Sequence, residues 1–91
     1  MTGAEMIAAE RRRQVDVEGF DDAHDDEHSS SELTLAAMGL LQAARGTNPK
    51  YCADPWGSVA KHHRDPVRML TIAGALIAAE IDRRLRTGAA S

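Results

Sequence analysis

Three segments of the chain carry apolar residues three or four positions apart, and charged or turn-forming residues separate these segments. Such spacing places the apolar side chains on one face of an α-helix. The pattern predicts a small all-α domain of three helices, at about residues 3–17, 30–45 and 66–86, in a single domain that spans residues 1–91. We expect an acidic loop after the first helix and a long loop containing Pro and Trp after the second.

Capping signals indicate where the three helices begin. Thr2 and Ser29 are each followed three residues later by a glutamate, the capping-box pattern that satisfies unpaired backbone N–H groups. Asp65 and Pro66 mark the third start, because Asp accepts from such N–H groups and Pro lacks the donor that would be orphaned there. Gly88 is expected to supply the C-cap of this last helix.

The third predicted helix is apolar on two neighbouring faces, which is typical of a helix buried on both sides. Because two short neighbours offer it little cover, we expect a homodimer formed through this helix. In a monomeric alternative, the segment 30–45 covers one face and the loop around Trp56 covers the other. The small residues Gly74 and Ala78 predict close approach of the segment 30–45 or of a second subunit.

Charge is distributed unevenly along the chain, although the net charge is only −3. Residues 1–32 carry ten acids and three bases, whereas residues 33–91 carry four acids and eight bases, so the two parts should attract each other. This distribution argues against a nucleic-acid-binding protein, which would carry an excess of basic surface. One basic cluster suits a phosphate group, and it consists of Lys61, His62, His63, Arg64 and Arg68.

Cysteine content and hydropathy bear on the cellular location. The single cysteine, Cys52, cannot form an internal disulfide, and Met1 is not followed by a basic-then-apolar leader. The longest nearly uncharged apolar run, residues 69–79, is about half the length that crosses a bilayer. We therefore expect a cytoplasmic protein that does not associate with a membrane.

Residues 24–28 read His-Asp-Asp-Glu-His, which matches the H-x-x-E-H signature of one zinc-peptidase class. The flanking residues do not favour a helix, and the chain is too short for those substrate-enclosing folds, so we reject the peptidase. A simpler divalent-metal site would use His24, Asp25, His28 and Glu80, whose nitrogen and oxygen ligands suit zinc or manganese. The other interpretation is that this acidic segment forms ion pairs with arginines of the first and third helices, without a cofactor.

A second candidate site would bind a small anion by charge, hydrogen bonding and aromatic stacking. Arg11 and Gln14 recur with Ile7 and Val15 at helical spacing, and Arg12 and Arg13 lie on the other side of the first helix. The candidate ligand-binding residues are Arg11, Gln14, His24, His28 and Trp56. A lone Trp is also typical of a side chain that closes the core, so both roles stay open for Trp56.

Several blocks occur together and in order: residues 7–14 (IAAERRRQ), Glu18-Gly19-Phe20, HDDEH at 24–28, Pro55-Trp56, and residues 73–83 (AGALIAAEIDR). In this combination the chain resembles a family of small proteins from tailed phages and prophages to which no activity is assigned. Members usually carry Trp at the position of Phe20, so this chain departs from the family in its aromatic residues.

The resemblance implies a phage accessory protein that acts in the cytoplasm of the bacterial host. By analogy, it implies a non-enzymatic binding module with a role in counter-defence or host takeover, which binds a host or phage protein or a small anionic ligand. The alternative is a metal-dependent hydrolase of a nucleotide or similar phosphate that uses the HDDEH segment.

Overall fold

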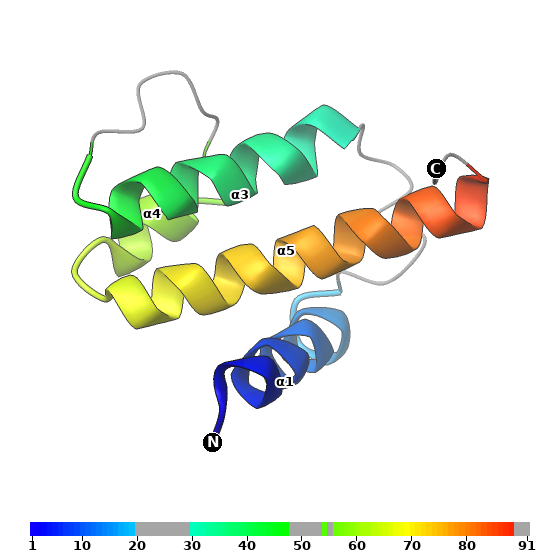
Figure 1. Cartoon of the computed structure of the whole chain (residues 1–91), viewed down its shortest axis with the longest axis horizontal. Coiled ribbons are helices and arrows are strands. Elements are labelled where there is room, and N and C mark those ends of the chain that lie inside the picture. Colours follow the sequence, from blue (N-terminus) through cyan, green and yellow to red (C-terminus); the bar gives the residue numbers. More distant parts are fainter. Residues whose placement is uncertain (20–29, 48–53, 55, 89–91) are drawn as a thin grey trace.

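Helices account for most of the described chain, as the computed structural model in Figure 1 shows. The structure describes residues 1–19, 30–47, 54 and 56–88. Its helices are α1 (Gly3–Asp16), α3 (Ser30–Ala44), α4 (Ser58–His62) and α5 (Pro66–Thr87). Within these described residues no strand occurs, so the prediction of a small all-α fold is confirmed. None of the described helices is long and apolar enough to span a bilayer.

The predicted caps define the ends of α1 and α5. The Thr2 hydroxyl accepts from the Glu5 N–H at 3.2 Å, and the Glu5 carboxylate accepts from the Thr2 N–H at 2.9 Å. At the start of α5 the Asp65 carboxylate accepts from the Arg68 N–H at 3.0 Å. Gly88 ends α5 with φ of +72°, a left-handed conformation that glycine adopts without steric cost. The three predicted helices therefore agree with the structure to within one residue.

The prediction of a long loop between the second and third predicted helices was wrong in part, because α4 lies within it. The N-cap residue of α4 is Gly57, which has no side chain that could accept from the free N–H groups. Instead the Asp54 carboxylate accepts from the backbone N–H groups of Val59 at 3.1 Å and Ala60 at 3.3 Å. A cap that lies five and six residues before the groups it satisfies escapes the usual capping patterns, which explains the missed helix.

The long helix α5 forms the centre of the fold. Figure 1 shows α3 lying antiparallel along one side of α5, while α1 crosses the other side and α4 lies near the N-terminal end of α5. Within the described chain α1 packs on α5 alone and contacts neither α3 nor α4. Two sides of α5 are thus packed against two different helices.

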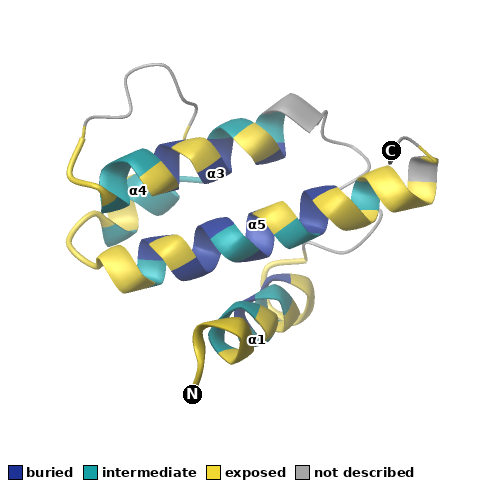
Figure 2. Cartoon of the chain, viewed as in Figure 1, coloured by how far each residue is buried: buried dark blue, intermediate teal, exposed yellow. Residues whose placement is uncertain are grey.

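The core lies between α3 and α5, where Figure 2 shows the buried residues facing one another. Its largest fully buried apolar side chains are Leu33 and Leu40 of α3 and Met69 and Leu76 of α5. Trp56 is half-buried and packs against this cluster from the segment before α4. Trp56 therefore does help to close the core.

The close approach predicted at Gly74 is made by α1. A Cβ atom at Gly74 would lie 2.6 Å from Cδ1 and 2.8 Å from Cγ1 of Ile7. The predicted partner, either the segment 30–45 or a second subunit, was therefore wrong at this position. The sequence does not reveal which helix crosses here, because a small residue permits a crossing without specifying the other helix.

The fully buried residues of α1 are polar, which the sequence pattern did not indicate. Its buried residues are Glu10 and Gln14, whereas Val15 is 36% exposed. Arg13, expected on the opposite side, is half-buried beside Glu10. A buried carboxylate is stable only when it is paired, so Glu10 requires the arginines that surround it.

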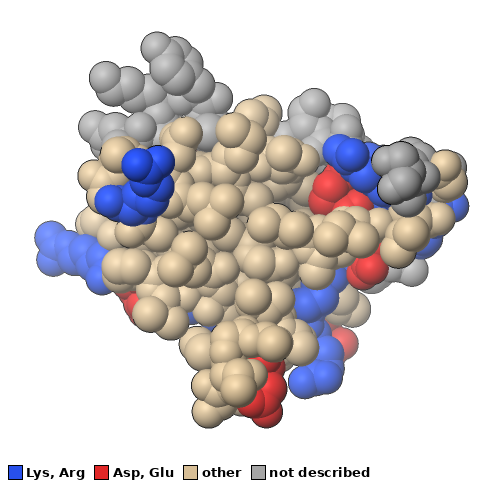
Figure 3. All heavy atoms as spheres, viewed as in Figure 1, with Lys and Arg blue, Asp and Glu red and all other residues tan. Residues whose placement is uncertain are grey.

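One side of α5 remains open between α1 and α3. Leu70, Ile77 and Ile81 are exposed by 48%, 43% and 53%, and Met38 of α3 is also exposed. An apolar groove of about 280 Å³ runs between α3 and α5 on this side. Figure 3 shows a broad uncharged surface over these helices, with most of the charged residues near its margins.

Candidate functional site

A cavity of about 90 Å³ lies between α1, α5 and the segment that contains α4. Polar and charged side chains line two of its walls, and Ile72 and Leu76 of α5 contribute apolar surface. We call it the Gln14 cavity. Its α1 wall consists of Glu10, Arg13, Gln14 and Glu18, and its α4 wall of Trp56, Ser58, Lys61 and His62.

Glu10 is the centre of the hydrogen-bond network on the α1 wall. Its Oε1 accepts from Arg13 Nε at 2.9 Å and from Arg68 Nη2 at 2.6 Å. Its Oε2 accepts from Arg13 Nη2 at 2.9 Å and from Gln14 Nε2 at 3.1 Å. Burial raises the pKa of Glu10, but the hydrogen bonds and charges of Arg13 and Arg68 outweigh it and hold that pKa below its ordinary value. Glu10 therefore stays ionised.

Arg13 links the buried carboxylate to the surface. Besides its two bonds to Glu10, it donates from Nη1 to the exposed Glu18 carboxylate at 2.7 Å. The hydrogen bonds to Glu10 and then to Glu18 raise the pKa of Arg13. These contacts fix the guanidinium in place. The carboxylates of Glu10 and Glu18 are therefore both paired with Arg13.

Gln14 is buried to 98%, with 2% of its surface exposed, yet only half of its amide group is paired. Its Nε2 donates to Glu10, which orients the amide, because turning it around would place Oε1 against a carboxylate. The Oε1 atom is buried and has no hydrogen-bond partner among the described residues. A buried unpaired acceptor costs about 1–3 kcal/mol, so a donor that reaches Oε1 would be bound favourably.

The α4 wall supplies donors and an aromatic surface. Ser58 and the exposed Lys61 come from α4, together with the half-buried His62 at its end. Asp54 caps this short helix through the N–H groups of Val59 and Ala60. A hydroxyl, an ammonium and an imidazole thus belong to the residues of the α4 wall.

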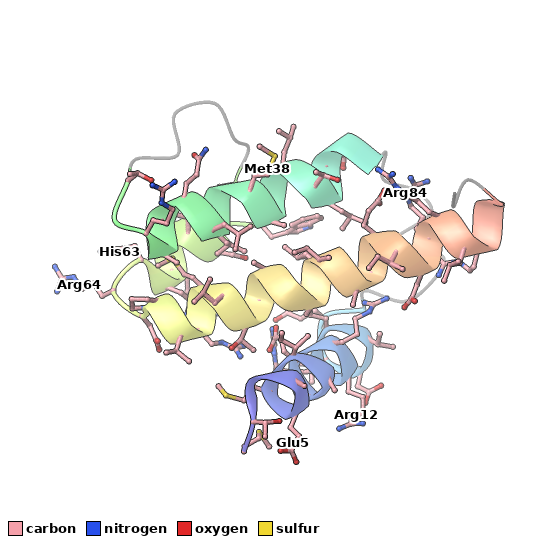
Figure 4. All side chains as sticks on the ribbon, viewed as in Figure 1. Glu5, Arg12, Met38, His63, Arg64 and Arg84 are labelled. Carbon is pink, nitrogen blue, oxygen red and sulfur yellow. The ribbon has the colours of Figure 1, made fainter. Side chains whose placement is uncertain are left out.

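The basic cluster expected to bind a phosphate does not form a single surface. Lys61 and His62 line the Gln14 cavity, and Arg68 is bound to Glu10. His63 and Arg64 lie in the turn before α5, where Arg64 extends away from the molecule (Figure 4). Part of the cluster therefore belongs to the cavity, and the rest serves the fold or faces outward.

The predicted ligand-binding set is only partly brought together. Gln14 and Trp56 line the same cavity, as expected. Arg11 does not join them, because it lines a separate hollow with Asp16 and Asp82. His24 and His28 lie outside the described residues. Arg11 and Gln14 thus line different hollows of the structure, and their shared role in ligand binding stays a prediction.

The metal site stays a prediction, because three of its four residues, His24, Asp25 and His28, lie outside the described residues. The fourth, Glu80, is buried and paired within α5: it accepts from Arg83 Nε at 2.9 Å and from Arg84 Nε at 2.6 Å. Hydrogen bonds from Arg83, opposed by burial and aided by Arg84, lower the pKa of Glu80. Among the described residues no three metal-ligating side chains come together.

Sequence reasoning named Lys61, His62 and Arg68 as part of a basic cluster but did not place them near Gln14, and it missed the role of Arg13. The spacing of Glu10 to Arg13 was a usable signal, because residues three apart on a helix are neighbours. Arg68 gives no such signal, since 58 residues separate it from Glu10. Comparison of the chain with protein-family models, curated proteins and solved structures found no match. Function is therefore inferred from the side chains themselves.

Proposed function

We propose that this chain is a non-enzymatic binding protein that holds a small anionic ligand in the Gln14 cavity. The observation that carries the proposal is that Gln14, a buried side chain whose Oε1 atom lacks a hydrogen-bond partner among the described residues, is one of the residues that line this cavity. Trp56 offers apolar and aromatic surface beside it, and Lys61 supplies positive charge. A concave site with a few oriented polar groups is the usual form of a ligand site.

The state of the ionisable groups favours binding over proton transfer. A general base needs a pKa near the working pH, whereas for Glu10 the effect of burial, which raises the pKa, is outweighed by the hydrogen bonds and charges of Arg13 and Arg68, which hold that pKa below its ordinary value. Arg13, whose pKa is raised, is equally unsuited to exchange protons. Such a wall orients a ligand without reacting with it.

The biological setting that we propose follows from the resemblance described above. A small accessory protein of a tailed phage or prophage would act in the bacterial cytoplasm, by binding a host or phage component. The Gln14 cavity suits a small molecule, while the open side of α5 suits a protein surface. A binding protein of this kind needs no catalytic group.

We test the ligand proposal by measuring amide and indole NMR shifts during titration with small carboxylates and phosphate. The signals of Gln14 and Trp56 are expected to move together, because both side chains line the cavity. Lys61→Met should weaken binding several-fold, whereas Arg12→Met, which removes the same charge from the outer side of α1 (Figure 4), should not. Binding of no small anion at these residues would refute the proposal.

We also propose that two copies associate through the open side of α5. Light scattering over a range of concentrations is expected to give the mass of two chains. Ile77→Lys should return the mass to that of one chain, because it places a charge in the apolar groove. Val17→Lys is the matched control, since Val17 is an exposed apolar residue at the C-cap of α1, outside the groove. A single-chain mass for the unmodified protein at every concentration would contradict the dimer.

A further inference from the structure

We propose that α1 detaches from α5 as a unit, while α3, α4 and α5 stay packed together. This inference concerns the conformational behaviour of the chain and goes beyond the proposed ligand binding. Two observations carry it: α1 lies outside the apolar core, and polar side chains account for its fully buried contacts. Detachment removes one wall of the Gln14 cavity, so the complete cavity exists only while α1 is docked.

The apolar core does not include α1. Its buried residues all belong to α3 and α5, and the half-buried residues packed against it come from α3 and from the segment around α4. Among the described helices, α1 contacts α5 alone, on a different side from α3 (Figure 1). Detachment of α1 therefore breaks no contact between α3 and α5, and the core keeps its buried Leu and Met side chains.

The surface of α5 beneath α1 carries small side chains. Ile7 of α1 contacts α5 at Gly74, which has no side chain. Thr71 and Ala78 each line a hollow together with residues of α1. Because the hydrophobic contribution grows with the apolar area removed from water, small side chains contribute less than the buried Leu and Met residues between α3 and α5. The docking of α1 therefore adds little apolar burial to the fold.

The fully buried contacts of α1 are polar, since they are made by Glu10 and Gln14. The ion pair between Glu10 and Arg68, at 2.6 Å, joins α1 to α5. Such a pair stabilises weakly, because removing its charges from water offsets much of their attraction. The Gln14 Oε1 atom is buried without a partner among the described residues, and detachment lets water bind it. Detaching α1 therefore costs less free energy than unfolding the core.

Detachment also separates the two walls of the Gln14 cavity. The α1 wall leaves with its helix, whereas α4 packs on α3 and α5 and stays with the core. A ligand that contacts both walls therefore holds α1 in its docked position. It slows hydrogen exchange in α1 by a factor set by the ligand concentration relative to its Kd. This consequence rests on the proposed ligand binding, whereas the detachment itself does not.

Native-state hydrogen exchange of the unmodified protein, without any ligand, tests the detachment. The most protected amides of α1 are expected to exchange at least about tenfold faster than those of α3 and α5, after correction for intrinsic rates. Low concentrations of urea should accelerate exchange in α1 less steeply, because detachment exposes less surface than global unfolding does. One common rate for the three helices, with the same dependence on urea, would overturn the proposal.

A substitution in the core separates detachment of α1 from global unfolding. Leu40 is completely buried in α3, which does not contact α1. Leu40→Val should accelerate exchange of the protected amides of α3 and α5 about fivefold by weakening the core, and leave exchange in α1 unchanged. Equal acceleration in α1 would show that α1 detaches only when the core unfolds, against the proposal. The measurement on the unmodified protein decides the matter if Leu40→Val does not fold.

Discussion

Glu10→Gln is expected to lower the free energy of unfolding by about 2 kcal/mol, the range for hydrogen bonds to a charged group. The substitution keeps the size of the side chain but removes the charge that Arg13 and Arg68 bind. It also turns one acceptor into a donor that faces a guanidinium. Urea denaturation near neutral pH measures the effect.

Glu18→Gln provides the matched control, because Glu18 binds the same Arg13 guanidinium. The Glu18 side chain is 41% exposed, whereas that of Glu10 is 2% exposed. Solvent screens the exposed pair, so this variant should lose less than about 1 kcal/mol. Equal losses in the two variants would show that burial of Glu10 contributes nothing to the strength of the network.

The effect of Glu10 is expected to depend on pH in a defined direction. Its pKa in the folded protein lies below the ordinary value of 4.5, so its contribution is fully present above that value. The contribution is lost as the pH falls from 4.5 through the lower pKa of the folded state. The difference in stability between the unmodified protein and Glu10→Gln should therefore shrink in acid, and a difference independent of pH would contradict this account.

Gly74→Leu is expected to destabilise the fold by about 1–3 kcal/mol through overpacking. A Cβ atom added at this position would lie 2.8 Å from Ile7 Cγ1. A larger side chain must therefore push α1 away from α5. Because α1 has no other helix to pack on among those described, its displacement should expose Glu10 and Gln14. Thermal and urea denaturation measure the loss.

A double-mutant cycle with Ile7→Ala isolates this contact. The smaller side chain at position 7 should recover part of the loss caused by Gly74→Leu, because it opens space at the crossing. Gly3→Leu is the control, since a Cβ at Gly3 has no neighbour within 4 Å. If Ile7→Ala and Gly74→Leu are additive, the crossing of α1 and α5 is not limited by this pair.

The sequence by itself predicted the helices whose ends depend on neighbouring residues. The pairs Thr2 with Glu5 and Asp65 with Pro66 position α1 and α5 correctly, because a cap acts within one helical turn. The short α4 was missed for the same reason: Asp54 caps it from five residues away. Local signals thus determined the elements wherever the stabilising contact was itself local.

The sequence also predicted that Gln14 and Trp56 belong to one site, because both offer groups that bind ligands. It could not show that Arg11 lies in a different hollow, since residues only three apart on a helix can face different neighbours. The pairing of Glu10 with Arg68 and the contact of Ile7 with Gly74 join residues far apart in the chain. Only the tertiary structure decided these contacts, because both depend on how α1 packs on α5. The buried charge of Glu10 is stable only where that packing brings an opposite charge to it.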